Sequence, residues 1–491
     1  MNGRASIRRP RPTVGPFVVL GVIALVPALV LFVVWRWAAG EATAADSPPQ
    51  ADAAVVPPPP TPALTTPLLS FRRAPSVLSR TLNVEVFTAA VTDFASSLND
   101  TSCVTVSVDG MPVGSANGDL ALIPASNQKL LTAAVALEVL GSDFLYTTEI
   151  RADAAAGVVS GDLFLVGGGD PLLTSSTYPV ENDPNPVTDP TSLDALADVV
   201  VDAGITRIDG SVLGDGSRYD DVYFAPSWSA DVRVVEAGPY DALLVNDARQ
   251  TGDPLKAADP AEGAARELTA LLRSRGVVVA GDPGVGEAPA GSTVVGSVQS
   301  APMSAVVGEM LSTSDNNTSE MVVKELGVAA GGAGTRGAGL EVMRSTLEAW
   351  GLTGVALADG SGLSNDNRVS CDGLADALAR FAPDDPLGAG LAVAGQTGTL
   401  TEVFTESPVA GRLRAKTGTL GNPPYNQDPP AVKSLSGYLP VDGGGAIEFS
   451  LILNGNGTMA DQGVYRPIWD ALVAMLATYP SGPTPADLKP R

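Results

Sequence analysis

The sequence predicts an α/β protein whose main domain is interrupted by an inserted, mainly β domain. Apolar residues at helical spacing occur before residue 144 and again after residue 300, and three strand-like runs follow residue 404. Between them, residues 145–299 change to short alternating segments with Gly and Asp turns. A structureless connection of that length is uncommon in a compact chain, so residues 145–299 are expected to fold as a domain of their own.

The N-terminal residues have the features of a membrane anchor followed by a spacer. An apolar run at 17–35 is long enough to span a membrane and exceeds the core of a signal peptide. Arginines concentrate ahead of this run, so the positive-inside rule places everything after residue 40 outside the cytoplasm. We therefore predict a cytoplasmic tip and transmembrane signal-anchor at 1–40, with a cleaved signal peptide and secretion as the alternative. Residues 41–76 are expected to form a Pro-rich linker, and residues 481–491 a C-terminal tail.

The composition excludes several classes of protein. A net charge of −24 argues against nucleic acid as a partner. The chain has no histidine and only two cysteines, Cys103 and Cys371. Ser–His–Asp, Cys–His and zinc–histidine mechanisms are therefore impossible, and we expect no metal and no cofactor. A nucleophilic serine would need another base, such as lysine. The sequence leaves open whether the two cysteines pair.

Ahead of the insertion, the sequence predicts a helix, a strand pair and a second helix. Residues 82–98 repeat apolar side chains at helical spacing. The strand pair 104–108 and 112–115 turns at Asp109-Gly110. Pro124 suits a first helical turn, and the apolar run from Leu130 to Leu140 continues at helical spacing up to Gly141, so a helix is expected to begin near Pro124 and end near Gly141.

The later elements follow from the same two periodicities. Short apolar runs between Gly and Asp turns predict strands in the insertion, and helical spacing predicts two helices there. In the insertion, the expected strands are 147–152, 161–166 and 210–213, and the helices lie near 192–203 and 261–275. After it, we expect helices at 302–312, 317–327, 338–350, 372–381 and 463–478, and strands at 412–419, 432–440 and 446–454.

Ser126 and Lys129 form a Ser-x-x-Lys motif at the start of the helix that begins near Pro124. Positions i and i+3 share one face of a helix, so the Lys129 amine is expected beside the Ser126 hydroxyl, where it can accept the proton. A single Ser-x-x-Lys also occurs by chance, as an ordinary lysine on an amphipathic helix.

Two further motifs make a chance origin much less credible. Ser314-Asp315-Asn316 and Lys416-Thr417-Gly418-Thr419 follow in that order, and the three motifs together are the set found in penicillin-interacting serine enzymes. Other features have ordinary structural interpretations. Asp315 is expected to be a turn or helix cap, residues 396–399 a loop, and Trp228 and Tyr240 core residues.

With these motifs, the sequence resembles the D-alanyl-D-alanine carboxypeptidase/endopeptidase family, the class C low-molecular-mass penicillin-binding proteins. Residues 161–171, 359–364 and 411–420 add to the resemblance, which covers about residues 80–479. It implies a penicillin-binding serine transpeptidase-like domain made of residues 77–144 and 300–480, with an antiparallel sheet and a helical cluster. The 145–299 insertion then lies between the Ser-x-x-Lys and Ser-x-Asn motifs, and one inserted domain is expected.

The resemblance also implies an acyl-serine mechanism on peptidoglycan stem peptides that end in D-Ala-D-Ala. Ser126 would attack the carbonyl between the two D-alanines, Lys129 would accept its proton, and Ser314 would relay a proton to the leaving D-alanine. Asn316 would hold the substrate amide. Four residues complete the predicted site: Lys416, Thr417 and Thr419 for the terminal carboxylate, and Gly418 for close backbone approach. Backbone N–H groups of Ser126 and Thr419 would form the oxyanion hole.

Three functions remain open from the sequence. The first is a membrane-anchored carboxypeptidase, with endopeptidase activity as an addition, that is inhibited by β-lactams. The second is a β-lactamase or esterase with the same acyl-serine chemistry. The third is a non-catalytic cell-wall binding or scaffold protein, which would have no need of the intact motifs.

Overall fold

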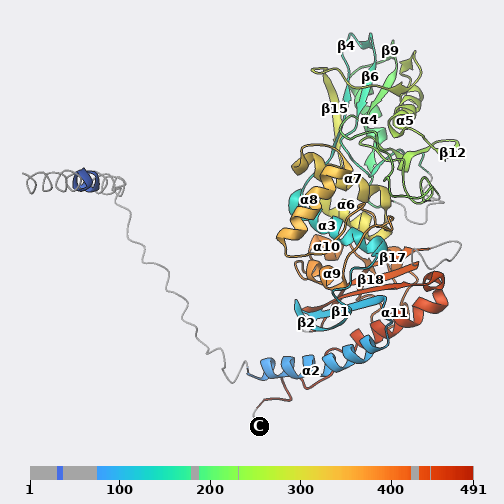
Figure 1. The fold of residues 1–491 in the computed structure, drawn as a ribbon. Coiled ribbons are helices and arrows are strands. Elements are labelled where there is room, and N and C mark those ends of the chain that lie inside the picture. Colours follow the sequence, from blue (N-terminus) through green and yellow to red (C-terminus); the bar gives the residue numbers. More distant parts are fainter. Residues whose placement is uncertain are drawn as a thin grey trace, which may run out of the picture. The chain divides into compact units, whose positions relative to one another are not determined.

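The computed structural model describes residues 30–36, 74–178, 187–230, 232–421, 431–442 and 444–489. By its internal contacts the chain divides into residues 1–70 and one larger unit, Phe71–Arg491, which carries all three motifs. Figure 1 shows the layers of this larger unit.

A six-stranded antiparallel sheet forms the central layer of the motif-bearing part (Figure 1). Residues from the two ends of the unit meet in it, because Ser102 pairs with Leu453. The predicted turn at Asp109-Gly110 joins two of the strands, and both residues have positive φ there. In sheet order the strands are β16 (Ala392–Val393), β17 (Arg414–Leu420), β18 (Ala431–Pro440), β19 (Ala446–Gly455), β1 (Ser102–Val108) and β2 (Met111–Ala116).

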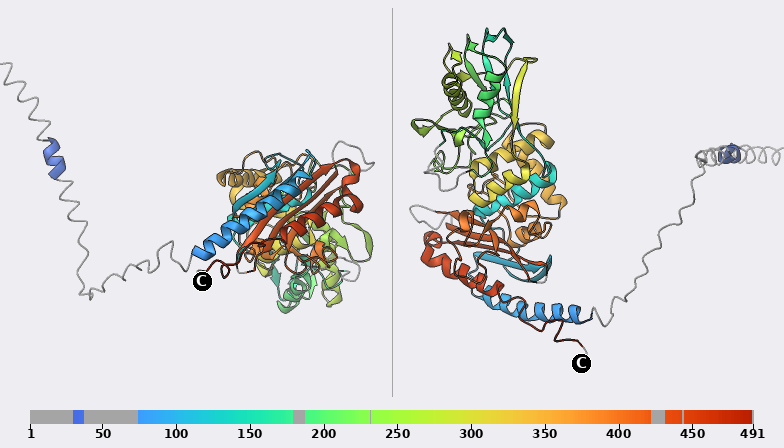
Figure 2. Two further views of the ribbon diagram at one scale, coloured as in Figure 1. Left: turned by 90° about the horizontal axis from the view of Figure 1, so that it is seen from below. Right: turned by 180° about the vertical axis from the view of Figure 1, so that it is seen from behind.

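Two helices cover one face of this sheet, α2 (Ala74–Ser96) and α11 (Gln462–Leu476) (Figure 2). Phe87 of α2 and Trp469 of α11 belong to the apolar cluster beneath them. α2 begins eight residues before the predicted start, inside the segment expected to be linker. The buried stripe of α2 starts at Pro75, and proline is well tolerated in the first turn of a helix.

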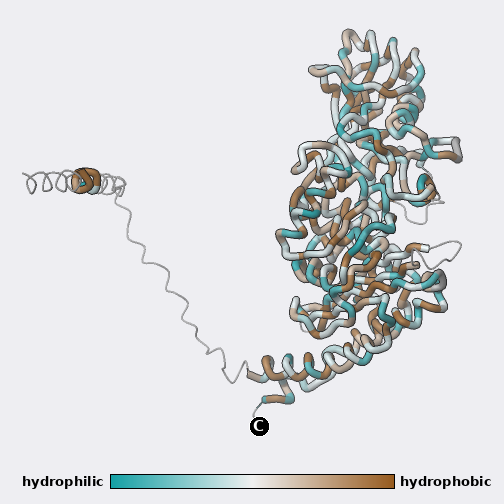
Figure 3. Tube along the Cα trace, viewed as in Figure 1, coloured by the Kyte–Doolittle hydropathy of each residue, from teal (hydrophilic) through white to brown (hydrophobic). Residues whose placement is uncertain are grey.

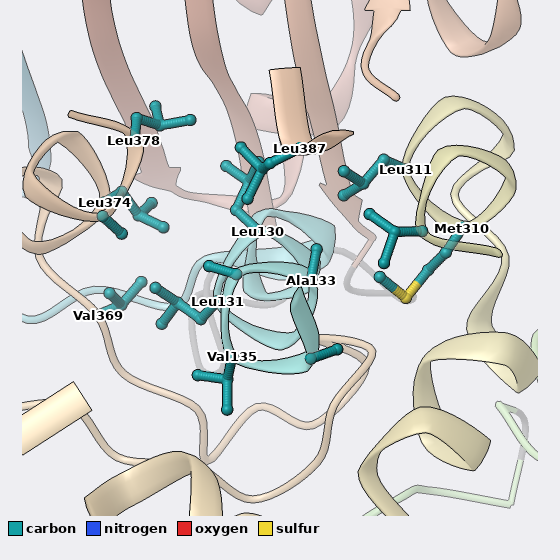
Figure 4. Close-up of a cluster of buried hydrophobic side chains, with 14 of the residues drawn as sticks. Leu130, Leu131, Ala133, Val135, Met310, Leu311, Val369, Leu374, Leu378 and Leu387 are labelled. Carbon is teal, nitrogen blue, oxygen red and sulfur yellow. The ribbon is translucent and has the colours of Figure 1, made fainter. Parts of the chain in front are cut away.

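Helices cover the other face of the sheet, with α3 (Gln128–Val139) in their middle (Figure 4). Leu130 and Leu131 of α3 pack among leucines of the neighbouring helices, including Leu311 and Leu374. A helix that is apolar on every side is stable only when it is enclosed in this way. The surrounding helices are α6 (Met303–Thr313), α7 (Asn316–Leu326), α8 (Arg336–Ala349), α9 (Cys371–Leu378) and α10 (Pro386–Ala389), with a π-helical turn at Gly327–Gly331.

The two cysteines form a disulfide between β1 and α9. It ties the central sheet to the helical layer across a sequence separation of 268 residues. A disulfide of this kind fits an oxidising compartment outside the cytoplasm.

The insertion has a sheet and an apolar cluster of its own. Its five-stranded sheet has the order β14 (Gly284–Val285), β10 (Val212–Asp215), β6 (Leu163–Val166), β3 (Thr147–Arg151) and β15 (Val294–Gln299). Helices α4 (Leu193–Asp202) and α5 (Pro260–Ser274) contribute to the same cluster, as the sequence predicted. The fold class expected from the sequence is therefore confirmed.

Shorter elements complete the insertion and the remaining connections. A four-stranded sheet has the order β13 (Val278–Val279), β9 (Arg207–Ile208), β5 (Val158–Val159) and β4 (Ala154–Ala155). Two strand pairs are β7 (Leu173–Thr174) with β8 (Thr191–Ser192), and β11 (Arg249–Gln250) with β12 (Asp253–Lys256). The 3₁₀ turns are Ala125–Asn127, Asn246–Ala248, Gly398–Leu400 and Gly457–Ala460.

Most of the predicted membrane span at 17–35 lies outside the described residues. Residues 30–36 are helical, and those from Val30 to Trp35 are apolar (Figure 3). Across the described part of the chain, no helix has both the length and the apolar character needed to cross a membrane.

Candidate active site

Ser126 and Lys129 lie side by side at the start of α3, as the motif predicted. Ser126 belongs to the 3₁₀ turn that leads into α3. Lys129 Nζ donates a hydrogen bond to Ser126 Oγ over 3.2 Å. It also donates to Asn316 Oδ1 and to the Ser361 carbonyl, both at 2.7 Å. The amine is therefore held in one place by three acceptors.

Burial lowers the pKa of Lys129 to about 8. Four carboxylates, on Asp315, Asp359, Glu320 and Glu236, oppose this effect without cancelling it. A lysine with such a pKa carries a neutral, proton-accepting fraction at neutral pH that an exposed lysine lacks.

Lys416 of β17 is also fully buried, and its Nζ donates to the Thr417 carbonyl over 2.8 Å. Burial, followed by repulsion from Lys129, lowers its pKa well below the usual lysine range. The sequence analysis assigned Lys416 to the terminal carboxylate of the substrate, a role in which the amine would carry a positive charge. An anionic group bound beside Lys416 would oppose both effects and favour its charged form.

Gly418 lets β17 approach the turn that carries Ser126. A Cβ atom at this position would collide with Ser434 Oγ and would lie 3.1 Å from the Ser126 backbone nitrogen. Ser434 Oγ itself donates to the Pro124 carbonyl, which fixes the strand to the turn. At Gly418 the close backbone approach is therefore between β17 and the turn that carries Ser126, which are both parts of the protein itself.

Ser314 and Asn316 lie where α6 ends and α7 begins. Ser314 adopts the left-handed backbone conformation, with φ 68°, a conformation that is uncommon for a non-glycine residue. Asp315 caps α7 by accepting from Thr318 N, which confirms its structural interpretation. Asn316 bonds Lys129 through Oδ1 and donates through Nδ2 to the Glu236 carbonyl of the insertion over 2.7 Å.

The three motifs open into one cavity of about 430 Å³. Ser126, Ser314, Asn316, Thr417 and Thr419 line it, whereas Lys129, Lys416 and Gly418 are buried and are not among its lining residues. The insertion forms another part of the wall, through residues that include Leu172, Glu236, Asp247 and Arg249.

Two buried acidic side chains, Glu320 and Asp359, fix the loop whose Ser361 carbonyl accepts from Lys129. Glu320 accepts from the backbone N–H groups of Gly360 and Ser361 at 2.9 Å each, and burial raises its pKa to about 8. Asp359 accepts from Trp228 Nε1 over 2.7 Å. Trp228 and Tyr240 are both buried in an apolar cluster, so their interpretation as core residues is confirmed.

Sequence reasoning missed Glu320 and Thr399. Thr417 Oγ1 donates to Thr399 Oγ1 over 3.0 Å, and both residues line the cavity. Thr399 belongs to the Gln-Thr-Gly-Thr segment that was interpreted as a loop, although its similarity to the Lys-Thr-Gly-Thr motif was a usable signal. Glu320 lies one helical turn after Asn316, and this spacing on one helix face was the available signal.

A serine beside a buried lysine, with a second buried lysine on β17, is the arrangement expected of penicillin-interacting serine enzymes. The sequence profile of the D-Ala-D-Ala carboxypeptidase 3 (S13) family matches residues 89–253 and 243–479. The chain belongs to this family, and it is a serine-type D-alanyl-D-alanine carboxypeptidase.

Known relatives agree with this assignment. The chain is 31% identical over 456 residues to the D-alanyl-D-alanine carboxypeptidase of Actinomadura sp. (strain R39), covering 75% of this chain and 79% of that protein. It is 29% identical to carboxypeptidase DacB of Mycolicibacterium smegmatis, covering 96% and 97% of the two chains. The crystal structure of penicillin binding protein 4 (dacB) from Haemophilus influenzae has the same fold, with a TM-score of 0.64 at 20% identity, covering 79% of this chain and 99% of that chain.

Proposed function

We propose that the protein removes the terminal D-alanine from peptidoglycan stem peptides through an acyl-enzyme on Ser126. The observation that carries the proposal is the contact between Lys129 Nζ and Ser126 Oγ inside a cavity that Thr417 and Thr419 also line. Small β-lactams would form an acyl-enzyme on the same serine and inhibit it.

Lys129 is the proposed proton acceptor. In its neutral form the amine has two N–H groups, which can remain bonded to Asn316 Oδ1 and the Ser361 carbonyl. Its lone pair then faces Ser126 Oγ, as a general base requires. We assign Ser314 the proton relay to the leaving D-alanine because it lines the cavity together with Ser126.

The substrate carboxylate is proposed to complete the charge arrangement. A carboxylate bound at Thr417 and Thr419 would favour the charged form of Lys416, whose pKa is lowered by burial and by Lys129. The charge on Lys416 would in turn disfavour a charge on Lys129. A substrate with a free carboxylate thereby promotes the neutral base that its own cleavage needs.

Asn316 and the backbone N–H groups are proposed to hold the rest of the scissile peptide. One N–H of the Asn316 amide is used by the Glu236 carbonyl, and an amide group has a second N–H to offer a substrate. Ser126 N lies close to Gly418 on β17, which supports an oxyanion hole formed by the N–H groups of Ser126 and Thr419.

The insertion, residues 145–299, is proposed to select among peptides. It supplies one wall of the cavity, so groups of the stem peptide beyond the D-alanines would contact it. We also propose endopeptidase activity as a second function. The leaving group of a cross-linked peptide is larger than a single D-alanine, and the insertion wall offers additional surface for it to contact.

We further propose that the enzyme works outside the cytoplasmic membrane, tethered by residues 17–35. The support is the apolar run, the arginines before it and the Cys103–Cys371 disulfide. Reporter domains fused after residue 76 test this topology. If the fusion is active only with a reporter that requires the cytoplasm, the topology is refuted. Release of the mature protein into the medium would favour a cleaved signal peptide.

Labelling with a fluorescent penicillin tests the central proposal. The protein should become covalently labelled, and mass spectrometry should place the adduct on the peptide that contains Ser126. The variant Ser126→Ala should remain unlabelled while keeping the same melting temperature. An adduct on Ser314, or no adduct at all, would contradict the assignment.

A further inference from the structure

Lys433 lies beside the cavity although it belongs to none of the three motifs. It is on β18, directly opposite Thr419 in the register of β17 and β18. Side chains that face each other in an antiparallel pair lie on the same side of the sheet and can interact. Lys433 Nζ donates to Thr419 Oγ1 over 2.7 Å.

Two aromatic rings of α11 hold the Lys433 amine in place. The ring centroid of Tyr465 is 4.2 Å from Nζ, and that of Trp469 is 5.8 Å away. An ammonium over the faces of such rings is stabilised electrostatically. Burial lowers the pKa of Lys433 to about 8, so most molecules still carry the charged, donating form at pH 7.

The hydrogen bond from Lys433 determines which donor and acceptor positions of the Thr419 hydroxyl remain available to a substrate. A hydroxyl has one donor hydrogen and two acceptor lone pairs. When the ammonium occupies a lone pair, the hydrogen of Thr419 is free to point in another direction. Thr419 lines the same cavity as Ser126, so that hydrogen can be offered to a substrate. A hydroxyl that accepts from a cation is also a stronger donor.

We propose that Lys433 is a positioning residue, which orients the Thr419 hydroxyl to donate to the carboxylate of the substrate. The inference rests on the proposed function, because it assigns Thr419 to a peptide that ends in a free carboxylate. Lys433 does not touch the reacting atoms and acts through Thr419 alone. It should therefore affect binding of carboxylate-bearing substrates and leave the chemistry at Ser126 intact.

The test compares Lys433→Met with wild type on two substrates, a peptide ending in D-Ala-D-Ala and an uncharged thioester. Methionine keeps an unbranched side chain against the rings of Tyr465 and Trp469 but cannot donate a hydrogen bond. We expect kcat/KM for the peptide to fall about tenfold, mainly through KM, the effect of losing one hydrogen bond to a charged group. Turnover of the thioester should change by less than twofold.

Three further variants separate positioning from a structural role. Lys433→Arg keeps a cationic donor and should restore most of the peptide activity. In Thr419→Val the hydroxyl is already absent, so adding Lys433→Met should cause little further loss. Lys489→Met, at an exposed lysine of the C-terminal tail, is the matched control and should behave as wild type.

The outcomes distinguish the inference from the proposed function. Equal loss on both substrates, or full additivity with Thr419→Val, would overturn the positioning role while peptide hydrolysis by wild type still stood. No hydrolysis of the peptide by wild type would instead overturn the proposed function. If Lys433→Met does not fold, Lys433→Gln supplies the comparison, because its neutral amide still donates. Lys433→Gln should then lose less peptide activity than Thr419→Val does. An equal or larger loss in Lys433→Gln would count against the inference.

Discussion

At the scale of single residues, the chemistry depends on the pKa values of two buried lysines, Lys129 and Lys416. Four acidic side chains raise the pKa of Lys129 and so oppose the effect of its burial. For Lys416, burial and the charge of Lys129 both lower the pKa. The two amines therefore respond differently to an incoming substrate carboxylate, although both are buried. This difference gives two predictions for the residues themselves.

Acylation should depend on pH through Lys129. The neutral amine is the proposed base and its pKa is lowered to about 8, so the rate should rise as the pH rises and level off above about 8. Two pH units below that value only about 1% of the base is neutral, and the rate should be about 100-fold lower. Rates measured with an uncharged thioester from pH 6 to 9 check this. A flat profile between pH 6 and 8 would exclude Lys129 as the titrating base.

Lys129 and Lys416 should fail differently when substituted. Lys129→Ala removes the base, so acylation should be lost with every substrate. Lys416→Ala removes the amine that is proposed to be charged when the substrate carboxylate binds. The loss of kcat/KM should therefore be at least tenfold larger for the D-Ala-D-Ala peptide than for an uncharged thioester. Steady-state kinetics with the two substrates provide the comparison. Equal losses for Lys416→Ala would contradict this division of roles.

At the scale of elements, the disulfide between β1 and α9 should be a major source of stability. It closes a loop of more than 250 residues, and removing such a link costs about 2–5 kcal/mol. The double variant Cys103→Ser/Cys371→Ser should unfold at lower urea concentration than wild type. Adding a reductant should shift wild type towards the variant and leave the variant unchanged. The same midpoint for both proteins under oxidising conditions would contradict the prediction.

The accuracy of the sequence predictions varied with the kind of element. The helix expected at 317–327 is found at Asn316–Leu326, where Val322 and Val323 precede Leu326 at helical spacing. The two-residue strands β4 and β5 have no periodicity to detect, and their pairing with other segments creates them. α2 was started too late because Pro75 was counted with the Pro-rich linker.

The site was predictable only where its chemistry is carried by side chains in motifs. Ser126 and Lys129 could be paired from their spacing, and the contact between them was confirmed. The Ser361 carbonyl could not be found in this way, because a backbone acceptor has no sequence signature. Lys433 reaches Thr419 only through strand register, which the sequence does not specify across 13 intervening residues.

At the scale of the whole molecule, the insertion is bound to the catalytic part through buried charges. Lys324 and Glu325 of α7 are fully buried and pair with Asp220 and Arg218 of the insertion. The partners on the insertion are about one third exposed, 36% for Arg218 and 32% for Asp220, so only the α7 member of each pair depends fully on its partner. Excising the insertion would uncover both charges, so its role is better tested by single substitutions.

Arg249 is the insertion residue best suited to that test. It lines the cavity with Ser126, and its side chain is half exposed. Arg249→Ala should change the relative kcat/KM of stem peptides of different length or charge by up to about tenfold, which corresponds to about 1.4 kcal/mol. Labelling by a small penicillin should be unchanged. Arg207→Ala, at another exposed arginine of the insertion, is the matched control, and an unchanged peptide ranking for both variants would contradict peptide selection by this residue.

The pairing of Ser102 with Leu453 also determines when the enzyme can begin to work. A ribosome delivers the N-terminal end first, so β1 must wait for almost the whole chain before its partner strand β19 exists. Contacts between residues so far apart in sequence form slowly. Ser126, Asn316 and Lys416 likewise come from three successive portions of the chain, so they cannot all be present before Lys416 has been synthesised. A partly synthesised chain would therefore have no assembled pocket, and binding of a fluorescent penicillin would report that synthesis and folding are complete.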